Sequence, residues 1–467
     1  MRLRSACLVA LLGAVPLVGC GGRAAVATAP TTQCAPAAHY PAAATAVAFW
    51  STEARCAIVP AGPGGVFGPE NLGNKFPGEA AVYMGIVHAA IYDAAVSLEG
   101  EYRPYAPTPR APANTSPEAA IATAAYDTLT GLQPQLGTDR TILDNDYQGY
   151  LTALPEATAA QRVAKRNGIT IGHAAAHAVL ALRSNDGRGC STTLQDLGLP
   201  AAAPGIWQPN PTGAALGLCL PGMRPLALKS ASQFRPAAPY ALTNRKYAKD
   251  FNQVKELGRI DSATRTADQT DEARFWTDHD IRQWNDGMLS LAAARRLNLV
   301  QTARLLVTGH VAGADAMIAC FDAKYHYWFW RPYQAIPRAD TDGNPATMAD
   351  ATWQPLGATP NFPEYPSAHA CHSTAVVQAL DAFFGTDKVS LTLTSRAPGL
   401  PDAARNRTYA RLQRVVKDVD RARVLVGFHF STSDLQGSAL GRTVGRYVAD
   451  EYFRPVSWRP QATTARR

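Results

Sequence analysis

The sequence lacks the patterns that mark several common classes of protein. None of its eight cysteines forms a Cys-x-x-Cys pair, which argues against a zinc knuckle. Its basic residues form no stripe interleaved with aromatic side chains, so we expect no nucleic-acid partner. Beyond residue 18 no run of about 20 apolar residues is uninterrupted, and we predict no transmembrane helix. Alternating β-branched runs are few and short, which leaves little signal for β-sheet.

The overall composition is that of a globular protein. Apolar residues make up 46% of the 467 residues and charged residues 18%, which is not the balance of a disordered chain. The formal net charge is +8, or +6 without Arg2 and Arg4. A positive charge of this size suits anionic substrates or an anionic membrane surface.

The first residues have the features of an export signal. Arg2 and Arg4 precede an apolar run over residues 6–18 that is too short to span a bilayer. The following Cys20 lies in a pattern that resembles the bacterial lipoprotein signal, in which this cysteine is lipidated. We therefore predict a signal peptide over 1–19, a lipid anchor at Cys20 and a flexible tether over 20–48. The protein would be exported, either as a periplasm-facing lipoprotein anchored to the bacterial membrane or, with an ordinary signal, as a secreted protein.

Export makes disulfides plausible among the six cysteines that follow Cys20. Proximity along the chain favours three pairs, which are Cys34–Cys56, Cys190–Cys219 and Cys320–Cys371.

Helical periodicity dominates the rest of the chain and predicts a mainly α fold built as a helical bundle or bundles. We divide it into an N-terminal helical part over 49–255, with an irregular Gly- and Pro-rich connection near 185–240, a second helical bundle over 256–455 that would carry catalysis, and a disordered tail over 456–467. The helices are expected over 79–97, 117–132, 139–153, 159–184, 280–298, 299–323, from just after Ser367, and over 403–428 and 434–452.

Three segments of the second bundle combine cations, histidines and a serine. They are Lys324-Tyr-His-Tyr-Trp-Phe-Trp-Arg331-Pro332, Pro366-Ser367-Ala368-His369 and Arg423-Val-Leu-Val-Gly-Phe-His429. Arginine and lysine offer many N–H donors and no acceptor, which is what a highly charged tetrahedral oxyanion requires. A helix that begins at Ala368 would add backbone N–H groups and the positive end of its dipole. The two histidines can attack, ligate or carry a proton.

Taken in order, the three segments resemble the K-x6-R-P, P-S-G-H and S-R-x5-H motifs of vanadium-dependent haloperoxidases and the type 2 phosphatidic acid phosphatase superfamily. The residues around them, such as Phe362-Pro363-Glu364-Tyr365-Pro366-Ser367, are most similar to the haloperoxidase version. Segments outside the motifs, among them residues 79–95 and 183–187, also look like bacterial members, so the likeness extends over roughly residues 70–453.

The resemblance implies a vanadate cofactor, a helical fold of this superfamily and a role for each matching residue. Lys324, Arg331 and Arg423 would bind the equatorial oxygens of vanadate, with help from Ser367 and the amide of Ala368. His429 would be the single protein ligand to vanadium, and His369 the acid–base residue that deprotonates hydrogen peroxide. The enzyme would then oxidise a halide, which would halogenate an organic acceptor.

Two residues depart from the family motif. Ala368 stands where the motif has Gly, so we expect its methyl group to perturb oxyanion affinity, and Ala422 replaces the Ser before Arg423. Phe362 resembles the residue found in family members that act on chloride.

Two further residues are candidates for the same region of the molecule. His326 is a candidate for the pocket wall. Asp434 is a candidate either to orient the ring of His429 or to cap the last helix.

Two other functions remain open at this stage. The same residues can transfer a phosphoryl group, because five-coordinate vanadate has the shape of that transition state. An exported acid phosphatase would use His429 as the nucleophile, forming a phospho-histidine, and His369 to protonate the leaving oxygen. Alternatively, the protein is an anchored helical scaffold with a vestigial site, in which case substitution of Lys324 or His429 would leave its function intact.

Overall fold

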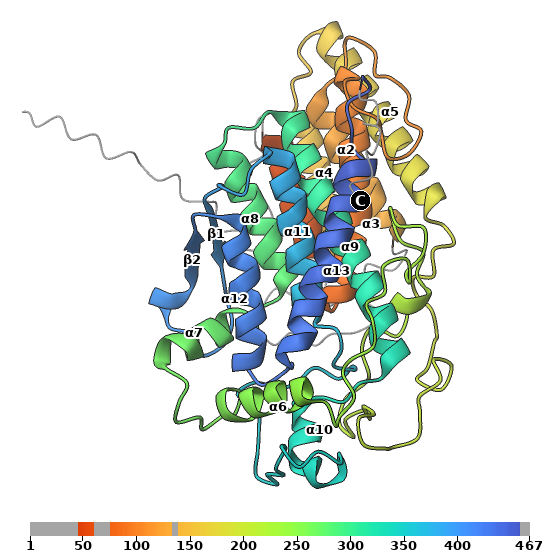
Figure 1. Cartoon of the computed structure of the whole chain (residues 1–467). Coiled ribbons are helices and arrows are strands. Elements are labelled where there is room, and N and C mark those ends of the chain that lie inside the picture. Colours follow the sequence, from red (N-terminus) through yellow and green to blue (C-terminus); the bar gives the residue numbers. More distant parts are fainter. Residues whose placement is uncertain (1–44, 60–74, 133–138, 458–467) are drawn as a thin grey trace, which may run out of the picture. The chain divides into compact units, whose positions relative to one another are not determined.

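The computed structural model describes residues 45–59, 75–132 and 139–457, which form mostly α-helices with one short β-hairpin (Figure 1). This confirms the mainly α fold class. The elements are α1 (Ala46–Ile58), α2 (Pro77–Glu99), α3 (Pro117–Leu132), α4 (Asp139–Ala153), α5 (Ala159–Leu182), η3 (Leu220–Gly222), α6 (Arg245–Leu257), α7 (Ala267–Phe275), α8 (Asp280–Ala294), α9 (Leu299–Tyr327), α10 (Pro332–Ala335), η4 (Ile336–Thr341), α11 (Ala368–Phe384), β1 (Leu391–Thr394), η5 (Asp402–Ala404), β2 (Asn406–Tyr409), α12 (Leu412–Leu425) and α13 (Ser431–Glu451).

Most predicted helices lie within a few residues of those observed, and their starts follow from capping residues. Thr158 with Gln161 caps α5, and Asn298 with Gln301 caps α9, each as a reciprocal capping box. The prediction of one helix over 403–428 was wrong, because β2 occupies 406–409 and pairs antiparallel with β1, so that α12 begins only at Leu412. The sequence also gave no prediction for α1, α6 and α7.

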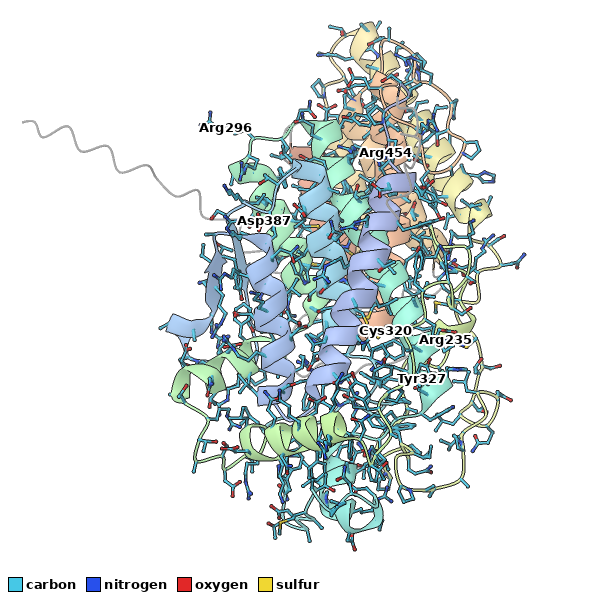
Figure 2. All side chains as sticks on the ribbon, in the orientation of Figure 1. Arg235, Arg296, Cys320, Tyr327, Asp387 and Arg454 are labelled. Carbon is cyan, nitrogen blue, oxygen red and sulfur yellow. A yellow bond between two sulfur atoms is a disulfide. The ribbon has the colours of Figure 1, made fainter. Side chains whose placement is uncertain are left out.

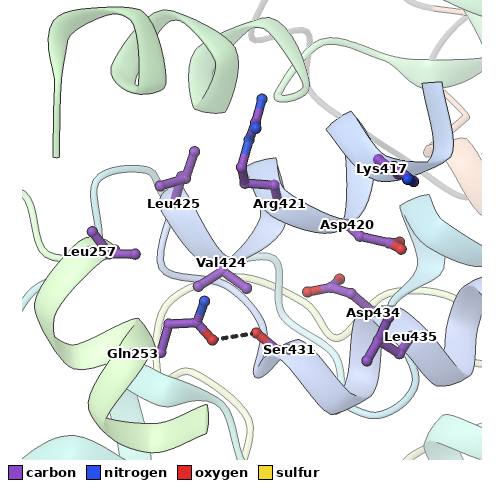
Figure 3. A pocket seen from close by; sticks show the side chains of 10 residues that line it. All are labelled: Gln253, Leu257, Lys417, Asp420, Arg421, Val424, Leu425, Ser431, Asp434 and Leu435. Atoms are coloured by element: carbon purple, nitrogen blue, oxygen red, sulfur yellow. Dashed lines mark hydrogen bonds between the residues drawn. The ribbon is translucent and has the colours of Figure 1, made fainter. Parts of the chain in front are cut away.

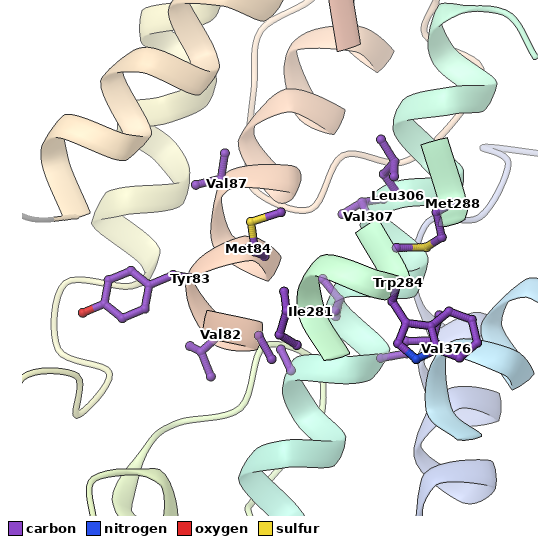
Figure 4. Packing of buried hydrophobic residues seen from close by; sticks show 14 of the residues in the cluster. Val82, Tyr83, Met84, Val87, Ile281, Trp284, Met288, Leu306, Val307 and Val376 are labelled. Carbon is purple, nitrogen blue, oxygen red and sulfur yellow. The ribbon is translucent and has the colours of Figure 1, made fainter. Parts of the chain in front are cut away.

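One buried core joins helices from both predicted parts of the chain. The long helix α9 packs against α2 on one side and α11 on another, and α11 packs against α13. Figure 4 shows side chains of this core converging from α2, α8, α9 and α11, among them Val82, Met84, Val87, Ile281, Trp284, Met288, Leu306, Val307 and Val376.

Glycines on α13 let α11 approach it closely. A Cβ on Gly437 would lie 2.6 Å from the carbonyl oxygen of Ser367, and one on Gly445 would lie 2.5 Å from the carbonyl oxygen of Ala375. Only glycine fits at such distances, so these residues fix the spacing between the two helices. Because Ser367 and His369 lie at the start of α11, this spacing also positions them beside the loop that precedes α13.

The end of α9 is held by the irregular chain between α5 and α6. Trp328 ends the helix with a left-handed conformation (φ 52°), which turns the chain towards Arg331. The carbonyl of Trp328 accepts a hydrogen bond from the Trp207 amide at 2.6 Å, and Trp330 donates its own amide to Gly205 at 3.0 Å. These bonds hold the segment between Lys324 and Arg331 in one conformation.

Two helices, α2 and α9, are long and apolar enough to cross a membrane by length and composition alone. In each, 94% of the most apolar window is buried inside the bundle. The absence of a membrane span therefore stays a prediction, and burial in the core accounts for the apolar character of these helices.

The cysteines pair only in part as predicted. Cys190 and Cys219 form a disulfide, which confirms that pair. Cys56 is disulfide-bonded, and Cys34, its predicted partner, lies outside the described residues. The prediction of a Cys320–Cys371 disulfide was wrong, because both thiols are free and buried, Cys320 on α9 (Figure 2) and Cys371 on α11.

Three predicted segments lie wholly or mostly outside the described residues. They are the signal peptide over 1–19, the tether over 20–48 and the tail over 456–467. Helix α1 begins at Ala46, inside the segment predicted as a tether.

Candidate active site

The cationic and imidazole side chains singled out from the sequence come from the ends of four helices. Lys324 lies in the last turn of α9, and Arg331 is the residue before α10. Arg423 lies in the last turn of α12, and His429 lies in the loop between α12 and α13. Ser367, Ala368 and His369 form the start of α11. Helix ends leave backbone groups unpaired and side chains free to converge, which suits a binding site.

Lys324 is completely buried and uses its ammonium group to hold a loop. Its Nζ donates to the carbonyls of Pro363 (3.0 Å), Glu364 (2.9 Å) and Pro366 (2.5 Å). Burial, together with the nearby Arg331 guanidinium, lowers the pKa of Lys324 to about 8. Because all three of its donors are used, Lys324 contributes charge to the site and fixes the backbone that leads into α11.

Arg331 is also buried and binds the same region from another direction. Its Nε donates to the carbonyl of Phe362 and its Nη1 to that of Phe428, both at 3.0 Å. Its guanidinium lies 4.7 Å above the Phe362 ring, and the Lys324 ammonium lies 5.0 Å from that ring. Phe362 therefore lies against both cations.

The ring of His429 has one defined tautomer. Arginine can only donate, so the contact of 3.1 Å between Arg331 Nη1 and His429 Nε2 makes Nε2 an acceptor with a lone pair. The proton then lies on Nδ1, which donates to Glu364 Oε1 at 2.8 Å. Burial, and then Arg331, lower the pKa of His429 well below its ordinary value, which keeps the ring neutral.

Glu364 is the functional candidate that sequence reasoning missed. Besides the His429 ring, its carboxylate accepts the Phe430 amide at 3.0 Å and the Ser433 hydroxyl at 2.6 Å. All three partners are donors, which fits an ionised carboxylate, although burial raises the pKa of Glu364 to about 7. The available signal was a single acid within the apolar run Phe362–Ser367.

Asp434 takes neither of the two roles that the sequence left open for it. Within the described chain His429 binds Glu364, and α13 begins after Phe430 with no side-chain cap. Asp434 is buried and faces Asp420, and both line a second cavity of about 330 Å³ (Figure 3). Burial, and then the charge of Asp420, raise the pKa of Asp434 well above its ordinary value.

His369 is the one imidazole of the motifs that is partly exposed, and it faces a cavity. Its ring is hydrogen-bonded to the backbone of Asp278, while its Nε2 has no partner among the described residues. Burial, and then the charge of Arg423, lower its pKa to about 3. The ring is therefore neutral at neutral pH with a lone pair at Nε2, and it becomes an effective base only when a bound anion raises its pKa.

A buried carboxylate lies near His369 and was also missed. Asp280, the first residue of α8, pairs with His372 at 3.2 Å. Burial alone would raise the pKa of Asp280, but His372 and His369 together hold it below its usual range.

His326 does not reach the site, and its prediction as a pocket residue was wrong. Its side chain is exposed, and it is absent from the residues that line the cavity. Residues two apart on an α-helix point about 200° apart, so His326 faces away from Lys324.

The motif residues open into a cavity of about 490 Å³. Ala368, His369, Arg423 and His429 line it, and Phe362 lines it as predicted for a pocket residue. Three buried polar atoms of the motif residues have no partner within the described chain, namely Arg331 Nη2, His369 Nε2 and Arg423 Nε, while the Ser367 hydroxyl interacts with Asp434.

The sequence and the fold of the chain were compared with those of known proteins. Residues 304–457 match the family described as the VCPO second helical-bundle domain. The vanadium chloroperoxidase of Curvularia inaequalis is 33% identical over 102 residues, which is 20% of this chain and only 16% of that protein.

Solved structures share the fold over most of their length. A bacterial vanadium-dependent iodoperoxidase superposes with a TM-score of 0.68 at 21% identity, covering 82% of this chain and 93% of that one. The apo form of a bacterial vanadium-dependent chloroperoxidase superposes with a TM-score of 0.63 at 16% identity. The superposition covers 83% of this chain and 95% of that one.

Residues 304–457 thus match the VCPO second helical-bundle domain, and the solved structures show that the chain shares the helical fold of these proteins.

The donor set of this site fits an oxyanion such as vanadate. A buried donor without a partner is costly, so the unpaired Arg331 and Arg423 atoms favour an anion with several acceptor oxygens. His429 Nε2 supplies the lone pair that a metal centre requires. Two groups are already engaged in the vanadate-free structure. The Lys324 donors bind backbone carbonyls, and the His429 lone pair accepts from Arg331 Nη1, which would have to release it to vanadium.

Proposed function

We propose that this protein is a vanadate-dependent haloperoxidase that oxidises halide with hydrogen peroxide. The observation that carries the proposal is the pair of unpaired buried donors on Arg331 and Arg423 beside a neutral histidine, whose Nε2 lone pair accepts from Arg331 Nη1 in the vanadate-free structure. Relatives named as vanadium chloroperoxidase and iodoperoxidase support it. Because those relatives act on different halides, the halide of this chain is a question for the assay, and Phe362 favours chloride.

Each residue of the chain has a defined part in this proposal. Arg331, Ser367 and Arg423, with the amide of Ala368, would bind the vanadate oxygens, and the charge of Lys324 would favour the anion. His429 would hold the metal through Nε2, with its ring oriented by Glu364. Bound vanadate supplies the Lewis-acid centre at which peroxide is activated towards halide.

His369 would carry the proton of the reaction. Its Nε2 has no partner among the described residues and its low pKa leaves it neutral, so once a bound anion raises that pKa it can take a proton from hydrogen peroxide as the peroxide binds. The same ring can return the proton to a departing oxygen. The partly exposed position of His369 at the cavity puts it where small substrates enter.

A paired assay on purified protein tests the proposal. Halogenation of a diketone acceptor is measured with peroxide and chloride, bromide or iodide, with and without orthovanadate, and the vanadate-free protein is offered a phosphate monoester in parallel. We expect halogenation that depends on vanadate. Hydrolysis of the monoester that vanadate inhibits, without halogenation, would establish the phosphatase, in which His429 Nε2 attacks phosphorus and His369 protonates the leaving oxygen.

Two substitutions give this assay its controls. His369→Gln should reduce halogenation by about a hundredfold or more, as expected for loss of a proton-transfer group. His326→Gln replaces an exposed histidine on the other side of α9 and should retain the parental rate. If neither assay gives turnover and Lys324 or His429 can be replaced without loss of the protein's biological role, the scaffold reading stands instead.

We further propose that the protein works outside the cytoplasm. The support is the leader and Cys20 in the sequence, followed by a disulfide between Cys190 and Cys219. Labelling with a palmitate analogue should mark the protein, and Cys20→Ala should abolish the label. An unlabelled protein in the medium would point to secretion.

A further inference from the structure

The cavity that contains the oxyanion site is much larger than vanadate, peroxide and halide require. Its volume is about 490 Å³, whereas a water molecule in the liquid occupies roughly 30 Å³. Sites of 300–1,000 Å³ or so are typical for small organic ligands. The cavity therefore has room for an organic molecule beside the catalytic residues.

One wall of this cavity consists of phenylalanine rings in mutual contact. The Phe76 ring lies 5.4 Å from that of Phe321, edge to face, and the Phe321 ring lies 5.1 Å from that of Phe362. Met317 and Phe428 add further apolar surface. Aromatic rings add favourably to such clusters by edge-to-face or offset stacking, so this wall favours a flat aromatic guest over a sugar or a peptide.

The charged residues of the cavity leave an excess of positive charge. The lining contains three arginines and one aspartate, a formal balance of 3 − 1 = +2 with the histidines neutral. Arg423 belongs to the oxyanion site, and Arg282 forms an ion pair with Asp278. This leaves Arg274 as the cation whose charge no carboxylate of the described chain neutralises.

Arg274 is placed to interact with a guest. It lies in the last turn of α7, is half-buried, and its Nη1 donates only to the carbonyl of Gly399 at 3.2 Å. A guanidinium has five donors in a planar fork that matches a carboxylate. A ligand that enters with its ring towards the phenylalanine wall could extend a carboxylate to this fork.

We propose that the cavity binds an aromatic carboxylate as the organic acceptor, with its ring against Phe76 and Phe321 and its carboxylate on Arg274. Such an acceptor is halogenated while bound, next to His369, instead of by oxidised halide that has diffused away. The inference rests on the proposed haloperoxidase function for turnover, but binding of the acceptor does not depend on it.

Three phenols that differ in one charged group test the inference. They are 3-(4-hydroxyphenyl)propanoate, which is negatively charged, 4-ethylphenol, which is neutral, and tyramine, which is positively charged. Their halogenation is measured at saturating peroxide, halide and vanadate, and the same three are treated with free hypohalite. We expect the enzyme to prefer the propanoate over the other two in kcat/KM by about fivefold beyond the preference of free hypohalite.

Substitution of Arg274 separates recognition of the acceptor from a general effect on anions. Arg274→Gln should reduce the ratio of propanoate to 4-ethylphenol to that of free hypohalite, and Arg274→Lys should restore part of it. Arg166→Gln removes an exposed arginine on α5, far along the chain from the lining, and should keep the parental ratio. An enzyme ratio equal to that of free hypohalite, or a Gln variant that slows all three phenols equally, would overturn the inference.

Calorimetry on the vanadate-free protein distinguishes failure of this inference from failure of the proposed function. Binding of the propanoate that Arg274→Gln weakens supports the site even if no halogenation is found. If the propanoate does not bind to the vanadate-free protein, the inference is wrong whatever the protein catalyses.

Discussion

Glu364 Oε1 accepts a hydrogen bond from His429 Nδ1 at 2.8 Å, and this bond keeps the proton on Nδ1 and leaves the lone pair on Nε2. The contact matters because a histidine can ligate or attack only through an unprotonated nitrogen. Glu364 reaches His429 across 65 residues of sequence, while its own carbonyl is held by Lys324. The orientation of the ring and the position of the buried ammonium group are thus coupled through one residue.

Removal of this carboxylate should weaken oxyanion binding. We expect Glu364→Ala to reduce vanadate affinity by about 10- to 100-fold, the usual cost of losing a partner that orients a ligating histidine. Glu364→Gln keeps an oxygen for Nδ1 and should lose less. The affinity is measured by titration with orthovanadate, and the tautomer by nitrogen NMR of the ring. A parental tautomer in the Ala variant would contradict the role given to Glu364.

Lys324 and Arg423 should differ in how they affect stability. Lys324→Met leaves three buried carbonyls without their donor, so we expect it to lower the free energy of unfolding by about 3 kcal/mol. Among the described residues Arg423 donates to one acceptor, the Trp276 carbonyl at 2.6 Å. Arg423→Gln should therefore destabilise the vanadate-free protein less.

The comparison of the two variants requires two measurements. Without vanadate, Lys324→Met should unfold at a lower temperature than Arg423→Gln. Both variants should bind vanadate at least tenfold more weakly than the parent. An Arg423→Gln variant that is as unstable as Lys324→Met would mean that Arg423 is mainly structural.

Anion binding should be accompanied by proton uptake at His369. Its pKa is about 3 in the vanadate-free structure, so the ring is neutral at pH 6, and a nearby dianion stabilises its protonated form. The pKa must rise on binding, which means that affinity falls as the pH rises through the new pKa. Sulfate is a suitable probe because its charge is constant over this range.

Calorimetry with sulfate in buffers of different ionisation enthalpy measures this uptake. His369→Gln should remove it, whereas uptake that persists in this variant would assign the proton to another group, with Glu364 the first candidate because burial raises its pKa to about 7.

Most helices could be predicted from the sequence, because periodicity and caps are local signals. The motif residues could be predicted to share one site, because together they resemble a known set of motifs. What could not be predicted depends on contacts between distant segments. Glu364 could not be matched to His429 without the fold, and Asp280 could not be matched to His372. The error over 403–428 has the same origin, since β2 is stabilised by pairing with β1 and not by its own sequence. The placement of His326 in the pocket wall did not allow for helical geometry, because His326 lies on the opposite face of α9 from Lys324.

Ala368 gives the most direct test of how tightly the site fits its anion. It is the first residue of α11, is buried, and lines the cavity where the family motif has glycine. Its methyl group occupies space beside the backbone amide that would bind vanadate, so Ala368→Gly should increase vanadate affinity by about two- to fivefold. The same change should lower stability by about 0.5–1 kcal/mol, because glycine loses more backbone entropy on folding. Vanadate titration and denaturant unfolding measure the two effects separately. A variant with lower stability and unchanged or weaker affinity would show that the methyl group does not crowd the anion. The start of α11 would then already leave room for the side chain of Ala368.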